Sequence, residues 1–250
     1  MAATAQILAE IADRAGEVVM RHYQAGPLAG KNLARRKDDN SPVTDADEEA
    51  EALILTALAQ AFPGVPVVAE EEAAAGRIQV VGNRFFLVDP LDGTKEFLSG
   101  NCEFTVNIAE VVDGIPVAGV VYAPALARMF GGDAGGAFEG AKPIRARAAS
   151  AEGLIAVGSR SHADAATAEF LKAYPVAKFV SAGSSLKFCL VAAGEADIYA
   201  RGGRTMEWDT AAGHAVLRAA GGSVNRWDGT PLLYGKAGFE NPAFVARGKL

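Results

Sequence analysis

The stretch RFFLVDPLDGTKEF, residues 84–97, places two carboxylates directly after an apolar run. Residues 85–88 are all large and apolar, which is typical of a buried strand, and Asp89 and Asp92 follow them. Burying an unpaired carboxylate is costly, and two carboxylates close together repel each other. The next residue, Gly93, allows a ligand to approach the backbone closely. The stretch therefore predicts a strand that ends at a site holding positive charge.

The composition is that of an ordinary globular protein. The chain has 250 residues, of which 50% are hydrophobic and 22% charged, so it can bury a substantial core. Its net charge of −6 argues against a nucleic-acid polymer as a partner, because binding to a phosphate backbone requires clustered cations. We interpret the one basic run, KNLARRK at 31–37, as a solvated loop.

Cysteine content and hydropathy predict a cellular location. Cys102 and Cys189 are too few for a disulfide framework or a zinc site, and we expect both to be buried thiols in a reducing compartment. The N-terminus carries acidic residues where a signal peptide needs an apolar core, and no later run is long enough to span a membrane. We therefore expect a soluble, cytoplasmic protein with no transmembrane segment.

The first half of the chain combines helices with hairpins. Apolar residues recur at helical spacing over 3–23 and again over 44–62, and the second of these segments has acidic residues in its first turn. Two β-hairpins are predicted further on, one over 104–126 with the turn VDGIP, and one over 127–144 with glycines at its turns.

A change of composition divides the chain. Residues 145–153 are mostly small and polar, and beyond them predicted strands alternate with predicted helices. Alternation of this kind indicates an α/β layer architecture. We therefore expect an N-terminal α+β domain over 1–145, with most of the acidic site, and a C-terminal α/β domain over 146–250.

Carboxylates recur at the edges of apolar segments. They are Asp45 and Asp47, Glu70 and Glu71, Asp89 and Asp92, and Asp209. Taken singly, the aspartates outside the 84–97 stretch could be helix N-caps and the glutamates a solvated turn. Taken together, an oxygen-rich set without a histidine pair suits Mg²⁺ or Mn²⁺ rather than zinc. Carboxylates that share two such ions are used in phosphoryl hydrolysis, with a hydroxyl such as that of Thr94 to orient water.

Four motifs in this order resemble those of one family: SPVTDAD (41–47), AEEE (69–72), DPLDGTKEF (89–97) and WDTAAGHA (208–215). They are similar to the signatures of the inositol monophosphatase superfamily of Mg²⁺-dependent, lithium-sensitive phosphatases. The resemblance extends over essentially the whole chain. It implies an α+β or α/β fold, the layered αβαβα sandwich of the inositol monophosphatase and fructose-1,6-bisphosphatase type.

Further segments resemble one branch of that superfamily. NCEFTVNIAEV, GVVYAP, GSRSHAD and GSSLKFCLVAAGEADIY are most similar to the 3′(2′),5′-bisphosphate nucleotidases, the CysQ-type enzymes of sulfate assimilation. The resemblance implies removal of the 3′-phosphate from adenosine 3′,5′-bisphosphate (PAP) to give AMP and phosphate. It also implies possible action on the related phosphosulfate PAPS, giving APS.

The resemblance also implies a metal site. Two to three Mg²⁺ ions would bind, and Mn²⁺ could substitute for them. The implied metal ligands are Glu70, Asp89, the backbone carbonyl of Leu91, Asp92 and Asp209. The implied catalytic set is Thr94, Asp47 and Glu70: Thr94, paired with Asp47, would orient the attacking water, and Glu70 would also support a third, weaker ion.

Substrate contacts are implied in two groups. The backbone N–H groups of Gly93 and Thr94 would bind the scissile phosphate. The implied contacts to the rest of the nucleotide are Ser159, Arg160, His162, Gly183, Ser184, Ser185, Lys187 and Arg201. A bisphosphate carries more charge than the metal ions cancel, so a lysine and an arginine nearby are electrostatically reasonable. Taken alone, Lys187 could be an exposed helix lysine and His162 a surface residue.

Three alternatives stay open at this point. A haloacid-dehalogenase-type phosphatase uses a DxDGT motif, but here two residues separate the aspartates rather than one. An inositol-1-phosphate or fructose-1,6-bisphosphate phosphatase would keep the superfamily and change the substrate. A non-catalytic nucleotide or metal sensor would need lost ligands, and none of the expected ones is missing. Either a monomer or a homodimer, and a peripheral association with the inner membrane, are compatible with the sequence.

Overall fold

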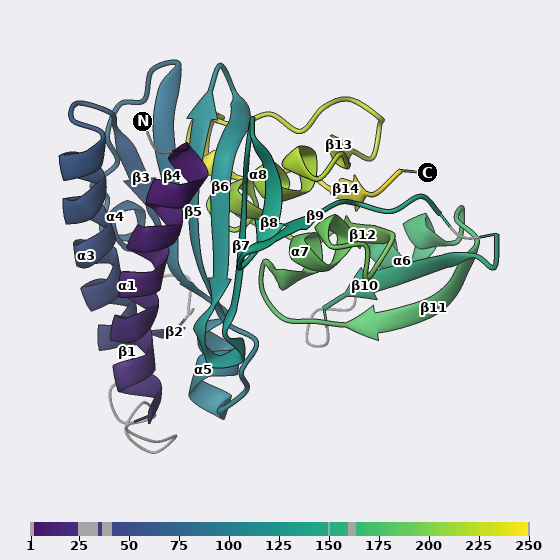
Figure 1. Cartoon of the computed structure of the whole chain (residues 1–250), viewed down its shortest axis with the longest axis horizontal. Helices are drawn as coiled ribbons and strands as arrows, with labels where there is room; N and C mark the ends of the chain where they lie inside the picture. Colours follow the sequence, from purple (N-terminus) through teal and green to yellow (C-terminus); the bar gives the residue numbers. More distant parts are fainter. Residues whose placement is uncertain (1–2, 25–34, 37–41, 150, 160–163, 250) are drawn as a thin grey trace.

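The computed structural model describes residues 3–24, 35–36, 42–149, 151–159 and 164–249. These residues form five layers, which Figure 1 shows from left to right. Two long helices make the first layer and a seven-stranded sheet the second. Two shorter helices lie between that sheet and a five-stranded sheet, and one more helix packs on the far face of the smaller sheet. The expected αβαβα sandwich is confirmed.

The long helices α1 (Thr4–Gln24) and α3 (Asp45–Ala61) cover the outer face of the larger sheet. Helix α3 begins after Thr44, whose hydroxyl accepts the N–H of Ala46, while the carboxylate of Asp47 accepts the N–H of Thr44. This reciprocal pair of bonds is a capping box. The interpretation of Asp45 or Asp47 as the N-cap is therefore wrong, because the residue before them takes that position.

The larger sheet follows the order of the chain. Its strands are β3 (Val67–Ala69), β4 (Arg84–Asp92), β5 (Thr105–Val112), β6 (Ile115–Ala123), β7 (Arg128–Asp133), β8 (Gly136–Glu139) and β9 (Lys142–Ile144). Only β3 and β4 are parallel among these neighbours. Both expected hairpins are present, and the second continues into a third strand, β9.

Strand β4 is apolar on both faces because both faces are covered. Phe86 and Val88 pack toward α1 and α3, whereas Phe85 and Leu87 pack into the core shared with the middle helices. Side chains alternate between the two faces of a strand, so a strand between two helical layers reads as a continuous apolar run. The run at 85–88 therefore marks the strand that carries the aspartates into the interior.

The smaller sheet has the order β11-β10-β12-β14-β13. Its strands are β10 (Leu154–Gly158), β11 (Val176–Ser181), β12 (Ile198–Arg201), β13 (Ser223–Arg226) and β14 (Phe244–Arg247). Strand β10 is parallel to both β11 and β12, whereas β14 is antiparallel to β12 and β13. The carboxyl ends of β10, β11 and β12 therefore meet at one edge, where open α/β sheets bind ligands.

The middle layer holds α7 (Leu186–Ala192) and α8 (Ala211–Ala219), and α6 (Ala165–Leu171) covers the other face of the smaller sheet. Helix α8 lies directly on the larger sheet at two glycines. A Cβ on Gly119 would lie 2.8 Å from the carbonyl oxygen of Ala212, and a Cβ on Gly132 would lie 2.7 Å from the Cβ of Ala219. This close contact fixes the start of α8 against the sheet that carries the aspartates.

The remaining elements are short: β1 (Arg35–Arg36), β2 (Pro42–Val43), α4 (Glu70–Ala74), α5 (Thr94–Ser99), η1 (Pro124–Leu126) and η2 (Ala237–Phe239). The larger sheet ends and the smaller one begins on either side of the expected boundary at 145–153. The division into two domains stays a prediction, because one apolar cluster contains residues of both sheets. Cys189 is buried as expected, but Cys102 is only half-buried, with its Sγ 3.7 Å from the hydroxyl oxygen of Tyr23.

Candidate active site

A cavity of about 240 Å³ lies between the ends of the two sheets. Its wall carries carboxylates, cations and small residues from segments far apart in the chain. The lining includes the carboxylates Glu70, Asp92, Glu96 and Asp209, the cations Lys95, Lys187, Arg201 and Arg204, and Gly93, Thr94, Ser159, Gly183 and Ser184. Most of the predicted site residues that the structure describes therefore share one cavity, although they span residues 70–209.

The two aspartates of β4 are placed by a bulge at the end of the strand. Asp89 lies opposite Asn107 on β5 and Asp92 lies opposite Thr105, so three steps along β4 face two along β5. Bulges often redirect side chains next to active sites. Asp89 is 1% exposed, and its carboxylate accepts the N–H of Leu91 at 3.0 Å. Asp89 and Leu91 therefore lie beneath the cavity, whereas Asp92 reaches its wall.

Negative charge accumulates between Asp92, Asp209 and Glu70. Desolvation at the cavity wall raises the pKa of Asp92, and Lys187 opposes this rise. Desolvation, followed by the neighbouring charges of Asp92 and Glu70, raises the pKa of Asp209 well above the usual range, and Arg201 only partly opposes it. Desolvated carboxylates with negative neighbours need a cation to ionise together.

The donor set fits a hard divalent cation. It consists of carboxylate and carbonyl oxygens, the ligands that Mg²⁺ prefers, and neighbouring histidine or cysteine ligands are not needed. Within the described ranges, no three histidine, cysteine, aspartate or glutamate side chains converge closely enough to form a finished metal centre. The carboxylates of Glu70, Asp92 and Asp209 are thus gathered around one cavity, where they would hold Mg²⁺.

Thr94 and Asp47 meet although they come from different elements. The Thr94 hydroxyl lies 3.4 Å from Asp47 Oδ1 and 3.3 Å from the carbonyl oxygen of Leu91. Asp47 is 2% exposed, and its other carboxylate oxygen accepts from the backbone N–H and the hydroxyl of Thr44. The capping box at the start of α3 thus also fixes the carboxylate that faces Thr94. The predicted pair is brought together.

Gly93 allows the closest approach between the two halves of the site. Its φ is +92°, in the left-handed region, and it precedes α5. A Cβ at this position would lie 2.3 Å from the hydroxyl oxygen of Ser184, so a side chain has no room here. The Ser184 hydroxyl lies 2.8 Å from the carbonyl oxygen of Asp92, which ties the loop before α7 to the end of β4.

The structure separates the two serines of GSSLK. Ser184 lines the cavity, as does Gly183, whereas Ser185 is 2% exposed and lies outside the lining. The Ser185 hydroxyl lies 3.1 Å from Asp92 Oδ2 and 2.7 Å from the backbone oxygen of Asp209. Ser185 therefore lies against the carboxylate of Asp92 and the backbone of Asp209, outside the lining of the cavity.

Lys187 is a cavity residue and not an exposed helix lysine. It is 6% exposed, and its ammonium donates to the carbonyl oxygen of Ser184 at 2.5 Å. Burial lowers the pKa of Lys187 to about 8, against the opposing attraction of Asp92. A buried ammonium of this kind remains available to an anion that enters the cavity.

Arg201 extends the positive side of the cavity at the end of β12. Its Nε is buried and has no hydrogen-bond partner among the described residues. Arg204 and Lys95 also line the cavity. The guanidinium of Arg204 lies 3.1 Å from the carboxylate of Glu240. Sequence reasoning gave no role to Arg204 or Lys95, although both lie within four residues of a predicted site residue. Ser159 lines the cavity, whereas Arg160 and His162 lie outside the described residues.

The model of the inositol monophosphatase family matches residues 1–247. The chain belongs to this family. Among its family relatives, the 3′(2′),5′-bisphosphate nucleotidase CysQ of Escherichia coli strain K12 is 44% identical over 239 residues, which cover 94% of this chain and 96% of that protein. The corresponding protein of Buchnera aphidicola is 40% identical over 82% of this chain and 77% of its own length.

Solved structures of family members have the same fold. CysQ from Bacteroides thetaiotaomicron superposes with a TM-score of 0.81 at 36% identity, covering 98% of this chain and 97% of that one. An IMPase from Thermotoga maritima gives a TM-score of 0.79 at 27% identity, covering 97% and 91%. The predicted family and the similarity to CysQ-type proteins are confirmed. None of the described helices has the length and apolar character needed to cross a membrane.

Proposed function

We propose that this chain is a Mg²⁺-dependent phosphatase that hydrolyses the 3′-phosphate of PAP to give AMP and phosphate, and that also accepts PAPS. One observation carries the proposal: the cavity joins the acidic wall of Asp92 and Asp209 to four cationic side chains, two of which are Lys187 and Arg201. Full-length similarity to proteins named 3′(2′),5′-bisphosphate nucleotidase supports the same substrate. The extra cations suit a substrate with a second phosphate.

The family is one of metal-dependent phosphatases. In this chain Glu70, Asp89, the carbonyl of Leu91, Asp92 and Asp209 would hold two to three Mg²⁺ ions, and Mn²⁺ would substitute. Bound Mg²⁺ supplies positive charge to the phosphate oxygens and acidifies water. Asp92 and Asp209 support this assignment, because desolvation raises the pKa of both and the charge of Asp92 raises that of Asp209 further.

The residues around Gly93 orient the reaction. Asp47 accepts the Thr94 hydroxyl proton, so the lone pairs of that hydroxyl are directed to accept a proton from water in the cavity. Asp47 in turn would take up the proton that Thr94 passes on as water attacks phosphorus, the bond from phosphorus to the 3′-oxygen would break, and a water near Asp209 would protonate that oxygen. The backbone N–H groups at the start of α5 would bind the equatorial oxygens of the scissile phosphate, because Gly93 leaves the backbone uncovered.

The positive side of the cavity would bind the second phosphate and the nucleoside. Lys187 and Arg201 would contact the second phosphate, and Ser159, Gly183 and Ser184 would contact the ribose or base. Contacts from Arg160 and His162 stay predictions. We assign Ser185 to holding Asp92 and Asp209 in place, since it is buried behind them.

A comparison of substrates tests the proposal. With Mg²⁺, kcat/KM for PAP should exceed that for inositol 1-phosphate and for fructose 1,6-bisphosphate by at least about tenfold, which corresponds to 1.4 kcal/mol of differential transition-state binding. Excess EDTA should abolish hydrolysis, and added Mg²⁺ should restore it. A smaller preference, or activity that resists the chelator, would reject the assignment. The family match argues against the haloacid-dehalogenase alternative, and a trapped aspartyl-phosphate would revive it.

A further inference from the structure

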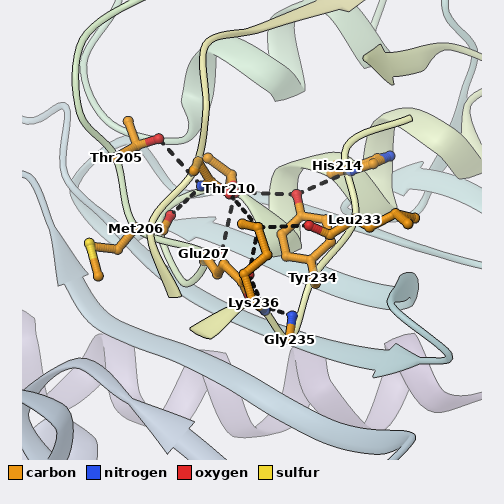
Figure 2. Close-up of polar contacts among 10 residues, drawn as sticks. Thr205, Met206, Glu207, Thr210, His214, Leu233, Tyr234, Gly235 and Lys236 are labelled. Atoms are coloured by element: carbon orange, nitrogen blue, oxygen red, sulfur yellow. Dashed lines mark hydrogen bonds and ion pairs between the residues drawn. The ribbon is translucent and has the colours of Figure 1, made fainter. Parts of the chain in front are cut away.

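A buried polar network joins the segment before α8 to the loop that precedes β14. Figure 2 shows Glu207, Thr210, Tyr234 and Lys236 close together between the two segments. We call it the Glu207 network, and its members are Thr205, Met206, Glu207, Thr210, Tyr234, Lys236 and Asn241. Five of the seven do not line the cavity, and three of these five are Glu207, Lys236 and Asn241. The proposed chemistry gives these three no role.

Glu207 is the buried charge at the centre. It is 0% exposed, and its carboxylate accepts the backbone N–H of Gly235 at 2.7 Å and that of Lys236 at 3.0 Å. The Lys236 ammonium lies 2.5 Å from the same carboxylate. That ammonium also donates to the carbonyl oxygen of Leu233 and to the side-chain oxygen of Asn241, so it has three acceptors for its three protons. The pair is fully satisfied, which a buried ion pair requires.

Asn241 links the Glu207–Lys236 ion pair to the segment 205–210 by hydrogen bonds. Its side-chain N–H₂ group donates to the carbonyl oxygen of Met206 at 2.7 Å and lies 3.0 Å from the hydroxyl of Thr210. The backbone N–H of Asn241 donates to the carbonyl oxygen of Thr205, and the N–H of Glu207 donates to that of Phe239. The segment is thus held at both ends.

Asp209 lies inside this held segment. Its carboxylate accepts the backbone N–H of Met206 at 2.8 Å, and Thr210 follows it directly. Asn241 fixes the carbonyl of Met206 and the side chain of Thr210, so it fixes the residues on both sides of the Asp209 carboxylate. Hydrogen bonds therefore connect the Glu207–Lys236 ion pair, through Asn241 and Met206, to the carboxylate of Asp209.

We propose that Glu207, Lys236 and Asn241 are positioning residues that hold Asp209 ready to bind a divalent cation. This inference rests on the proposed Mg²⁺-dependent function. Asp209 lines the cavity with Asp92 and Glu70, and the N–H of Met206 holds its carboxylate there. The network fixes Met206 and Thr210 on either side of Asp209, so the ion binds to a ligand whose position is already set.

Two substitutions test the network without leaving a buried charge unpaired. Glu207→Gln removes the central charge, and the Lys236 side chain, 31% exposed, can then reach water. Asn241→Ala removes the link to Met206 and Thr210 and leaves the ion pair in place. A matched control is Asp197→Asn: Asp197 is 1% exposed, pairs with Arg147 and accepts the N–H of Ile155, but does not line the cavity.

The readout is Mg²⁺ binding to the full-length, metal-free chain, measured by titration calorimetry. We expect both network variants to bind Mg²⁺ about 10–100-fold more weakly than wild type, the range found when the partners that orient metal ligands are removed. The Mg²⁺ concentration for half-maximal hydrolysis of PAP should rise, and KM at saturating Mg²⁺ should not. Asp197→Asn should lower Tm and leave Mg²⁺ affinity unchanged.

Trp208 offers a second, local readout. It lies between Glu207 and Asp209, is 8% exposed, and is one of only two tryptophans in the sequence. In a Trp227→Phe background its fluorescence should respond to Mg²⁺ in the wild-type network, and the response should need more Mg²⁺ in the two variants.

The outcomes separate the inference from the function it rests on. Unchanged Mg²⁺ affinity in whichever network variants retain wild-type circular dichroism, with wild type binding Mg²⁺ and hydrolysing PAP, overturns the inference alone. An equal loss of affinity in Asp197→Asn also overturns it, since any weakening of the fold would then suffice. A wild-type chain that neither binds Mg²⁺ nor hydrolyses PAP overturns both.

Discussion

The hydroxyl of Ser185 lies 3.1 Å from a carboxylate oxygen of Asp92, which comes 93 residues earlier in the chain. The same hydroxyl oxygen lies 2.7 Å from the backbone oxygen of Asp209 and accepts the side-chain N–H of Asn107 at 3.1 Å. One buried side chain therefore connects the end of β4, strand β5 and the start of α8. The acidic wall of the cavity is built on this junction.

Replacing Ser185 with Ala should weaken both the fold and the site. The substitution leaves the buried N–H group of Asn107 without its acceptor and Asp92 without a donor, which costs about 1–3 kcal/mol of unfolding free energy. The Mg²⁺ concentration needed for half-maximal activity should also rise. Urea denaturation and a Mg²⁺ titration measure the two effects. Ser99→Ala, which removes an exposed hydroxyl bonded to Glu96, is the control. A Ser185→Ala protein with wild-type stability would contradict the assignment.

Replacing Thr94 with Val should reduce turnover more than binding. Valine keeps the shape of threonine and removes the hydroxyl that Asp47 orients, so water in the cavity loses its positioning group. We expect kcat to fall by about 10²–10⁴-fold, the range for a positioned proton acceptor, while KM changes little. Steady-state kinetics on PAP measure both constants. Thr56→Val, on the exposed face of α3, should leave both unchanged. A rise in KM with kcat preserved would instead assign Thr94 to binding alone.

Ionisation of Glu51 should lower the free energy of unfolding as the pH rises. This residue is 3% exposed and accepts the backbone N–H groups of Glu71 and Glu72, and burial raises its pKa from 4.5 to about 7. Between these values the folded chain holds the proton and the unfolded chain releases it. The contribution of Glu51 to the free energy of unfolding is therefore greatest below pH 4.5. It falls as the pH rises toward 7, by at most about 3 kcal/mol.

Glu51→Gln cannot ionise and should remove this dependence. In EDTA, the unfolding free energy of the variant relative to wild type should increase from pH 5 to pH 8. Urea denaturation at the two pH values measures the difference, with Glu10→Gln, an exposed glutamate on α1, as the control. A difference that stays constant between the two pH values would mean that Glu51 does not titrate in this range.

The sequence predicts those parts of the fold whose signal is local. The apolar run at 85–88, the turn at VDGIP and the helical spacing over 3–23 each depend on neighbouring residues, and each element is present. The cap of α3 was assigned wrongly because Thr44, Asp45 and Asp47 are all good capping residues in sequence. Only the geometry shows that the first of them caps and that the third closes the box.

Contacts between distant segments could not be predicted in this way. Nothing near Lys187 in the sequence indicates that it is buried, because its burial depends on the packing of α7 against the smaller sheet. The resemblance of GSSLK implies a substrate contact for both serines, and only the fold shows that Ser185 is buried outside the cavity lining that Ser184 joins. Arg204 has no motif of its own, and the fold alone places it in the cavity wall.

Arg201 and Arg204 should discriminate between substrates with two phosphates and those with one. The buried Nε of Arg201 has no partner in the described part of the chain, and the Arg204–Glu240 pair is exposed on both sides, so it contributes little and can give way to a phosphate. Arg201→Met should raise KM for PAP by about 10–100-fold, equivalent to one charged hydrogen bond, and should change KM for adenosine 3′-monophosphate far less.

Arg204→Met should act in the same direction with a smaller effect, whereas Arg226→Met, which breaks a comparable exposed pair with Asp228, should leave KM for both nucleotides unchanged. Steady-state kinetics on the two nucleotides measure the ratio, and equal losses on both substrates would show that neither arginine binds the second phosphate.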